Sequence, residues 1–179
     1  MFYRNLVYCT NMSETLINKV AQSGLITLDL EDFFPKEEIV QLDIRDFLFR
    51  GLILKELEFR ASLKATDWAV YQNRIVAVHC STDAIVPQWA WMLVATCLTN
   101  HTTHYFFGTK EEVEQKLFLL NVKELDASRY TGERVVIKGC GTRTVSGEAY
   151  LEITKKLQPV VKSLMFGEPC STVPVYKKK

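Results

Sequence analysis

The chain has 179 residues, of which 47% are hydrophobic, and a net charge of +1 from 22 basic and 21 acidic residues. This length suits one domain with a full core, and the hydrophobic fraction is typical of a globular protein. The balanced charge argues against a nucleic-acid-binding protein, and no apolar run is long enough to span a membrane. We therefore predict a cytoplasmic protein without a nucleic-acid or membrane partner.

The beginning of the chain indicates an extension ahead of the folded domain. Residues 1–11 form only a brief apolar stretch and lack the cleavage site of a signal peptide. Ser13 is a typical helix cap, and a short helix is predicted over 13–22. We predict a disordered extension over 1–11 and a single α/β domain over 12–179.

The first half of the domain alternates short apolar runs with turns. Residues 25–30 alternate apolar and polar side chains, which predicts a strand. A second strand is predicted over 39–44, running into a helical turn at Phe47 and Leu48. The stretch 52–71 is predicted to be mainly helical.

The second half predicts strands and helices in alternation. Strands are predicted over 74–79, 104–107 and 134–137. Helices are predicted after Pro87, after a capping box from Thr109 to Glu112, and from near Ser146. Pro159 is expected to kink or break the last helix, residues 160–165 fit its continuation, and Gly167 with Pro169 is the predicted helix stop. Strands linked by helices pair in parallel through right-handed crossovers. The pattern predicts a three-layer, mainly parallel α/β sheet with helices on both faces, and we recognise no internal repeat in it.

Three of the five cysteines lie among turn-forming residues, namely Cys80, Cys140 and Cys170. An odd count in a chain of this size argues against a disulfide framework and leaves thiol chemistry or metal binding open. Cys80 and Cys140 follow predicted strands of one sheet, so we expect their turns at the same edge, where parallel sheets bind ligands. Cys170 joins them if the tail crosses that edge. Cys97 lies inside a predicted helix and is expected in the core.

Three chemical functions compete for these positions. In the first, the three thiolates bind zinc or an iron–sulfur cluster, with His79 or Asp83 as a further ligand. In the second, Cys80 is a nucleophile or persulfide carrier, and the helix N-terminus expected after it lowers the pKa of its thiol. In the third, a glycine-rich turn cradles an anionic ligand before a helix. The residues of this predicted cradle are Gly139, Gly141 and Arg143.

The same residues also have a structural interpretation. Free cysteines are among the most buried residues in proteins. Trp68, Trp89 and Trp91 stand at helical positions, which is more typical of a core or an interface than of a stacking platform. A non-catalytic interaction module with structural cysteines is therefore a further class of function, beside a thiol site and a cysteine enzyme.

Five stretches of sequence carry a family resemblance. They are SGLITLDLED (23–32), GLILKE (51–56), CSTDAIVP (80–87), VIKGCG (136–141) and GEPCSTVPVY (167–176). From about residue 13 onward the chain resembles an uncharacterised bacterial family known only as a conserved domain of unknown function. Its members tend to be encoded beside SUF-type iron–sulfur assembly proteins. The resemblance implies an accessory protein of iron–sulfur or sulfur metabolism, with iron–sulfur assembly proteins as partners.

Overall fold

The structure is a computed structural model that describes residues 24–139, 141–168 and 170–179. The extension predicted over 1–11 and the helix predicted over 13–22 lie outside the described residues and stay predictions. Within the described part of the chain, no helix has the length and hydrophobicity needed to cross a membrane.

The elements follow one another in a regular order. The strands are β1 (Leu25–Asp29), β2 (Ile39–Asp43), β3 (Ile75–His79), β4 (Tyr105–Phe107), β5 (Arg134–Lys138), β6 (Ser163–Glu168) and β7 (Ser171–Lys177). The α-helices are α1 (Glu56–Ala65), α2 (Gln88–Leu98), α3 (Lys110–Glu124) and α4 (Gly147–Leu157). Short 3₁₀ helices are η1 (Leu30–Phe33), η2 (Ile44–Phe47), η3 (Trp68–Tyr71) and η4 (Ala127–Tyr130).

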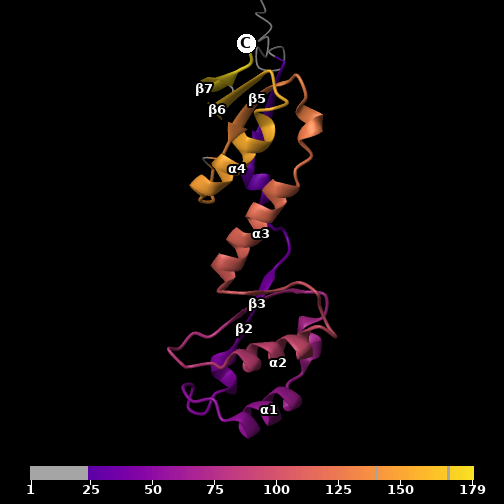
Figure 1. The fold of residues 1–179 in the computed structure, drawn as a ribbon, viewed down its shortest axis with the longest axis vertical. Helices are drawn as coiled ribbons and strands as arrows, with labels where there is room; N and C mark the ends of the chain where they lie inside the picture. Colours follow the sequence, from indigo (N-terminus) through magenta and orange to yellow (C-terminus); the bar gives the residue numbers. More distant parts are fainter. Residues whose placement is uncertain (1–23, 140, 169) are drawn as a thin grey trace, which may run out of the picture.

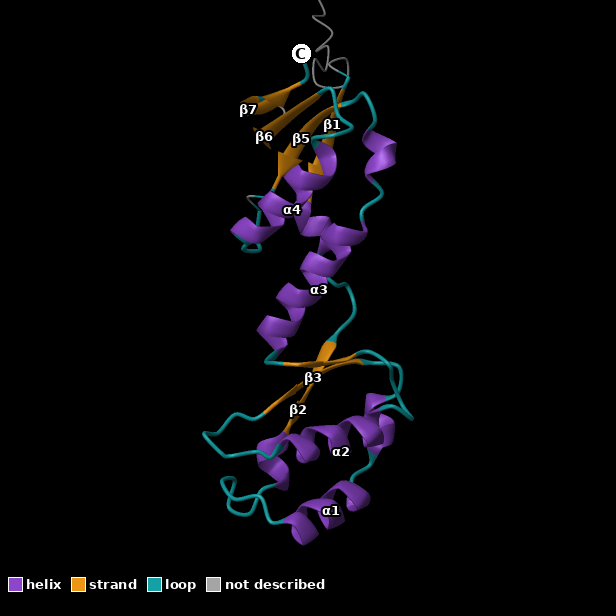
Figure 2. Ribbon diagram, in the orientation of Figure 1, coloured by secondary structure: helices purple, strands orange, loops and turns teal. Residues whose placement is uncertain are grey.

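The strands form two separate sheets (Figure 2). One sheet has the order β1-β5-β6-β7, and the other has the order β2-β3-β4. All pairs are parallel except β6 with β7, which are antiparallel. The predicted α/β class with mainly parallel strands is therefore confirmed, but the expectation that β3 and β5 share one sheet is wrong.

One lobe is inserted into the other. The inserted lobe, residues 39–107, contains β2, β3, β4, α1 and α2. The composite lobe combines residues 25–34 with residues 115–177, on either side of the insertion, and contains β1, β5, β6, β7 and α4. Helix α3 runs from the inserted lobe to the composite lobe (Figure 1).

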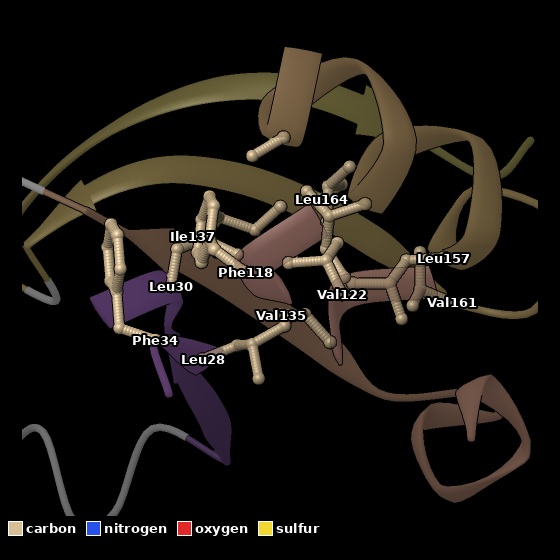
Figure 3. Close-up of a cluster of buried hydrophobic side chains, with 12 residues drawn as sticks. Leu28, Leu30, Phe34, Phe118, Val122, Val135, Ile137, Leu157, Val161 and Leu164 are labelled. Carbon is tan, nitrogen blue, oxygen red and sulfur yellow. The ribbon is translucent and has the colours of Figure 1, made fainter. Parts of the chain in front are cut away.

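Each lobe has its own hydrophobic core. In the composite lobe, Phe34 stacks on Phe118 with ring centroids 4.2 Å apart. Around them pack apolar side chains from β1, β5, β6, α3 and α4 (Figure 3). In the inserted lobe, Phe59 is fully buried and makes edge contacts with Phe47 and Trp89. Trp68, Trp89 and Trp91 are half-buried against this second core, as their helical spacing predicts.

The two cores are copies of each other. Phe118 follows Phe59 by 59 residues, and all ten buried residues of the inserted core have buried counterparts in the composite core. From Phe59 onward the spacing is always 59 residues, and before it the spacing is 14 residues. The pairs are Leu28–Leu42, Leu30–Ile44, Phe34–Leu48, Phe118–Phe59, Val122–Leu63, Val135–Val76, Ile137–Val78, Ala149–Ala90, Ile153–Val94 and Leu157–Leu98. The expectation of no internal repeat is therefore wrong.

Backbone conformation repeats along with the core. Asn73 and Gly132, which are 59 residues apart, have positive φ values of 56° and 76°. Gly108 and Gly167 are separated by the same spacing and have φ values of 133° and 120°. These turns need a left-handed conformation, which glycine and asparagine adopt most readily. The fold is thus a duplicated strand–helix–strand–helix–strand unit.

Helix α3 serves both lobes. Its Thr109 capping box is present as predicted, with the Thr109 hydroxyl and the Glu112 carboxylate each bonded to the other residue's backbone. Near its beginning, Val113 and Leu117 pack against Ile39 and Phe106 on the free face of the inserted sheet. The inserted lobe therefore has helices on both faces of its sheet. The second half of α3 corresponds to α1 and enters the composite core.

The end of the chain differs from the prediction. Helix α4 ends at Leu157, and the expected continuation through Met165 is strand β6 instead. Pro159 cannot continue a helix, and the turn after α4, in which the Val160 and Val161 amides both donate to the Leu157 carbonyl, leads into β6 at Ser163. Gly167 is not a helix stop but precedes the turn of the β6–β7 hairpin, which places β7 at the edge of the composite sheet.

Candidate functional site

The predicted thiol site is divided between the two lobes. Cys80 follows β3 in the inserted lobe, whereas β5, which precedes position 140, belongs to the composite lobe. The expectation that Cys80 and Cys140 follow strands of one sheet is therefore wrong. Cys140 itself lies outside the described residues. Cys170 is exposed in the β6–β7 turn of the composite lobe.

Cys80 lies in a loop rather than at a helix N-terminus. Helix α2 begins only at Gln88, eight residues later, so the expected activation of Cys80 by the dipole of that helix is wrong. Its half-buried Sγ lies 3.5 Å from the Thr82 hydroxyl, which donates to the Gly51 carbonyl at 2.8 Å. These contacts hold Cys80 in the packing of the inserted lobe.

The predicted metal ligands do not form a cluster within the described residues. His79 lies at the end of β3, opposite Asp43 of β2, and Asp83 is exposed in the following loop. In the part of the chain that the structure describes, no three His, Cys, Asp or Glu side chains could share a metal ion. The zinc or iron–sulfur site formed by Cys80, Cys140 and Cys170 depends on an undescribed residue and stays a prediction.

The glycine-rich turn after β5 is bonded to a carboxylate of the chain itself. Glu31 Oε1 accepts a hydrogen bond from the Arg143 backbone N–H, and Glu31 Oε2 accepts one from the Thr142 hydroxyl, both at 3.3 Å. A side chain added at Gly141 would overlap this carboxylate, which explains the glycine. The backbone amides that were predicted to bind an anionic ligand therefore face Glu31. An added anion would have to displace the Glu31 carboxylate.

Hydrogen bonds dominate the electrostatics of this turn. Burial raises the pKa of Glu31, but the amides of Arg143, Thr142 and Gly141 outweigh it, so that the pKa lies below its usual value. Beside the turn, Lys138 pairs with Glu168 at 3.4 Å and with Asp29 at 3.7 Å. The hydrogen bond from Lys138 to Glu168 raises the pKa of the lysine. These ion pairs join the carboxyl ends of β1, β5 and β6.

Sequence reasoning missed an apolar groove on the composite lobe. It has a volume of about 770 Å³ and lies along α4, between this helix and strands β6 and β7. Tyr150 and Phe166 meet edge to face at one end, with ring centroids 5.6 Å apart, and Leu151 is 75% exposed at its side. The other lining residues are Ile137, Thr154, Lys155, Gln158, Pro159, Leu164, Met165 and Val175.

The inserted lobe has an equivalent but much smaller groove. It lies between α2 and β4 and has a volume of about 210 Å³. Trp91 and Phe107 meet edge to face there at 5.1 Å, and they occupy the positions of Tyr150 and Phe166. The internal repeat is the sequence signal that relates the residues of one groove to those of the other.

The fold and these sites define a two-lobed α/β protein built by duplication, with an apolar groove in each copy. Over residues 14–178 the chain matches the model of the family described as Protein of unknown function (DUF2480), and it belongs to that family. No curated protein and no solved structure matches the chain. The resemblance to a family of unknown function is thereby confirmed, and the link to iron–sulfur assembly stays a prediction.

Proposed function

We propose that this protein is an interaction module that binds a short apolar segment of a partner protein in the groove of the composite lobe. The observation that supports the proposal is the groove itself. It is lined by apolar side chains from α4, β6 and β7, and its mouth carries the 75%-exposed Leu151. Exposed apolar patches of this kind mark interaction sites on soluble proteins.

The charge around the groove favours an acidic partner segment. Lys155, in the last turn of α4, is the only charged residue that lines the groove among the described residues. Its positive charge offsets the negative end of the helix dipole. A partner segment with an apolar face and flanking Asp or Glu residues would complement both features.

The shape of the groove favours a peptide. The groove is lined from Tyr150 on α4 to Gln158 at the C-cap of this helix, which corresponds to about 12 Å along the helix. Two turns of a helix, or three to four residues of a strand, span this length. Apolar anchors at such spacing are the usual mode of helix-in-groove recognition.

A pair of matched variants tests the proposal. The probe is a fluorescently labelled amphipathic peptide of Leu and Glu, compared with a Leu and Lys peptide of the same pattern. We expect the wild-type protein to bind the Leu–Glu peptide more tightly, and Leu151→Glu to weaken binding at least about tenfold. Met92→Glu, at the equivalent position of the inserted lobe, is the control. Equal binding of both peptides, or unchanged binding by Leu151→Glu, would contradict the proposal.

A second candidate function is sulfur or soft-metal handling, with iron–sulfur assembly proteins as partners. The supporting observation is the Lys138–Glu168 ion pair of 3.4 Å, which joins the end of β5 to the end of β6. The turn that contains Cys140 and the turn that contains Cys170 therefore begin side by side. We propose that these two cysteines, without Cys80, form the thiol site of such a protein.

Thiol reactivity and metal content test this second function. We expect anaerobically purified protein to contain zinc or iron in wild type and in Cys80→Ser, and to lose it in Cys140→Ser and Cys170→Ser. Cys97 is an internal control for alkylation, because burial raises the pKa of its thiol and slows its reaction. The thiol site would be excluded if the wild-type protein contained no metal and if Cys140→Ser and Cys170→Ser had the same metal content and thiol reactivity as wild type.

A further inference from the structure

The inserted lobe presents an uncharged surface beside the edge of its sheet. Helix α2 contains no Asp, Glu, Lys, Arg or His over its eleven residues. Its counterpart α4 carries four charged residues, namely Glu148, Glu152, Lys155 and Lys156. Exposed helices in monomeric proteins usually have a polar, charged face. The difference between two copies of one unit indicates that α2 is under a different constraint.

The same surface exposes large apolar side chains. Met92 on α2 is 70% exposed and Phe107 at the end of β4 is 65% exposed. Trp91, next to Met92 on α2, is half-buried, and its ring meets that of Phe107 edge to face with centroids 5.1 Å apart. Depletion of charge together with exposed Met and Phe beside a half-buried Trp is the composition found at the centre of protein interfaces.

The edge of the inserted sheet is open where the composite sheet is closed. Strand β6 pairs on its outer side with β7, whereas no described strand pairs with the outer side of its counterpart β4. Unpaired sheet edges are sites of association with other chains. The Phe107 carbonyl at this edge accepts a hydrogen bond from Lys116 at 2.5 Å.

We propose that two copies of this chain associate through the α2–β4 surface, defined by Trp91, Met92, Thr96 and Phe107, across a two-fold axis. A two-fold contact brings each residue near the axis against its own copy, and like charges there would repel. The uncharged α2 helix meets this condition, and the charged α4 helix does not. The hollow at this surface is also smaller than the composite groove, at about 210 Å³ against about 770 Å³.

Among the described residues, charged side chains border this surface, and on the α1 side the Arg60 guanidinium stands 5.5 Å from the centroid of the Trp89 ring on α2. Glu111, Glu112 and Lys116 on α3 flank Phe107 on the side away from α2. They carry both signs, so they form a polar rim that two copies can approach without net repulsion. The dimer proposal does not rest on the peptide groove, which lies on the other lobe.

Substitutions at Met92 in the full chain test the dimer. We expect wild-type protein to sediment as a dimer, and Met92→Glu and Met92→Lys each to raise the dimer dissociation constant at least about tenfold. Because Met92 is mostly exposed, both variants keep the wild-type circular dichroism spectrum. Leu151→Glu, the matched change on the composite lobe, leaves the dimer intact. Thr96→Arg, one helical turn further on the same face, is a second disruptive variant.

Mixing the two Met92 variants tests the symmetry. If the two Met92 side chains face each other, an equimolar mixture of Met92→Glu and Met92→Lys regains dimers, because opposite charges then meet across the axis. A monomeric wild type, or a dimer that neither the Met92 variants nor Thr96→Arg weakens, would overturn the proposal. Dimers lost in each Met92 variant but not regained in the mixture would overturn the two-fold arrangement. Loss of peptide binding in Leu151→Glu does not bear on these outcomes.

Discussion

The inserted and composite lobes share a fold and a core but differ on their surfaces. All ten buried positions of the inserted core recur in the composite core, and two positive-φ turns recur with them. Outside the core, the uncharged α2 replaces the charged α4, and β7 covers one sheet edge only. The comparison teaches that packing and backbone geometry limit change at buried positions, whereas surfaces are free to acquire separate functions.

The largest predicted effect concerns the paired core phenylalanines. Phe59→Ala and Phe118→Ala should each lower the free energy of unfolding by about 3–5 kcal/mol, because each removes a fully buried ring. The three tryptophans all lie in the inserted lobe, so tryptophan fluorescence reports its unfolding and circular dichroism reports both lobes. Phe59→Ala should shift the fluorescence transition in urea more than Phe118→Ala does. Equal shifts would mean that the lobes unfold as one unit.

The hairpin that only the composite lobe possesses provides the second prediction. Gly167 has a φ of 120°, and a Cβ there would lie 2.5 Å from the Ser171 carbonyl oxygen. Gly167→Ala should therefore cost about 1–3 kcal/mol of stability through backbone strain. Thermal unfolding measures the loss, and Gly147→Ala, at a glycine with open space around it, is the control. An unchanged melting temperature in Gly167→Ala would contradict the geometry of this hairpin.

The third prediction uses the acidic anchor that distinguishes the two lobes. Glu31 holds the turn at Thr142 and Arg143, whereas Arg45 stands at the equivalent position of the inserted lobe. Because folding lowers the pKa of Glu31, its stabilising effect is complete above the unfolded pKa and is lost as pH falls through the folded pKa. Wild type should be more stable than Glu31→Gln at pH 7, and the difference should vanish in strong acid. Urea titrations at several pH values measure this stability difference. If it persisted at low pH, the ionised Glu31 carboxylate would not be its cause.

The smallest predicted effect exchanges a residue between the lobes. Gly132 has a φ of 76°, and its counterpart Asn73 has a φ of 56°. Gly132→Asn should change stability by less than about 0.5 kcal/mol, because asparagine tolerates this conformation. Gly132→Val should cost more, since a β-branched residue rarely adopts a positive φ. Urea unfolding of both variants checks the equivalence of the two turns.

Local sequence signals predicted most of the elements and little of the candidate site. The period-two pattern of β1, the apolar runs of β3 and β5, and the Thr109 capping box depend on neighbouring residues, which a sequence displays directly. The duplication could also have been recognised in the sequence, since Leu28-Asp29-x-x-Asp32-Phe33 recurs as Leu42-Asp43-x-x-Asp46-Phe47. The helical expectation failed for residues 163–165 because pairing with β5 and β7 makes them part of a strand.

The sequence by itself predicted the α/β class and the mainly parallel pairing, because short-range periodicity and the alternation of strands with helices indicate them. Only the tertiary structure decided that each repeat builds its own sheet. That division separates Cys80 from the turn containing Cys140 and brings Glu31 to the amides of Thr142 and Arg143. Such contacts join segments more than a hundred residues apart, and no local pattern encodes which strands will be neighbours.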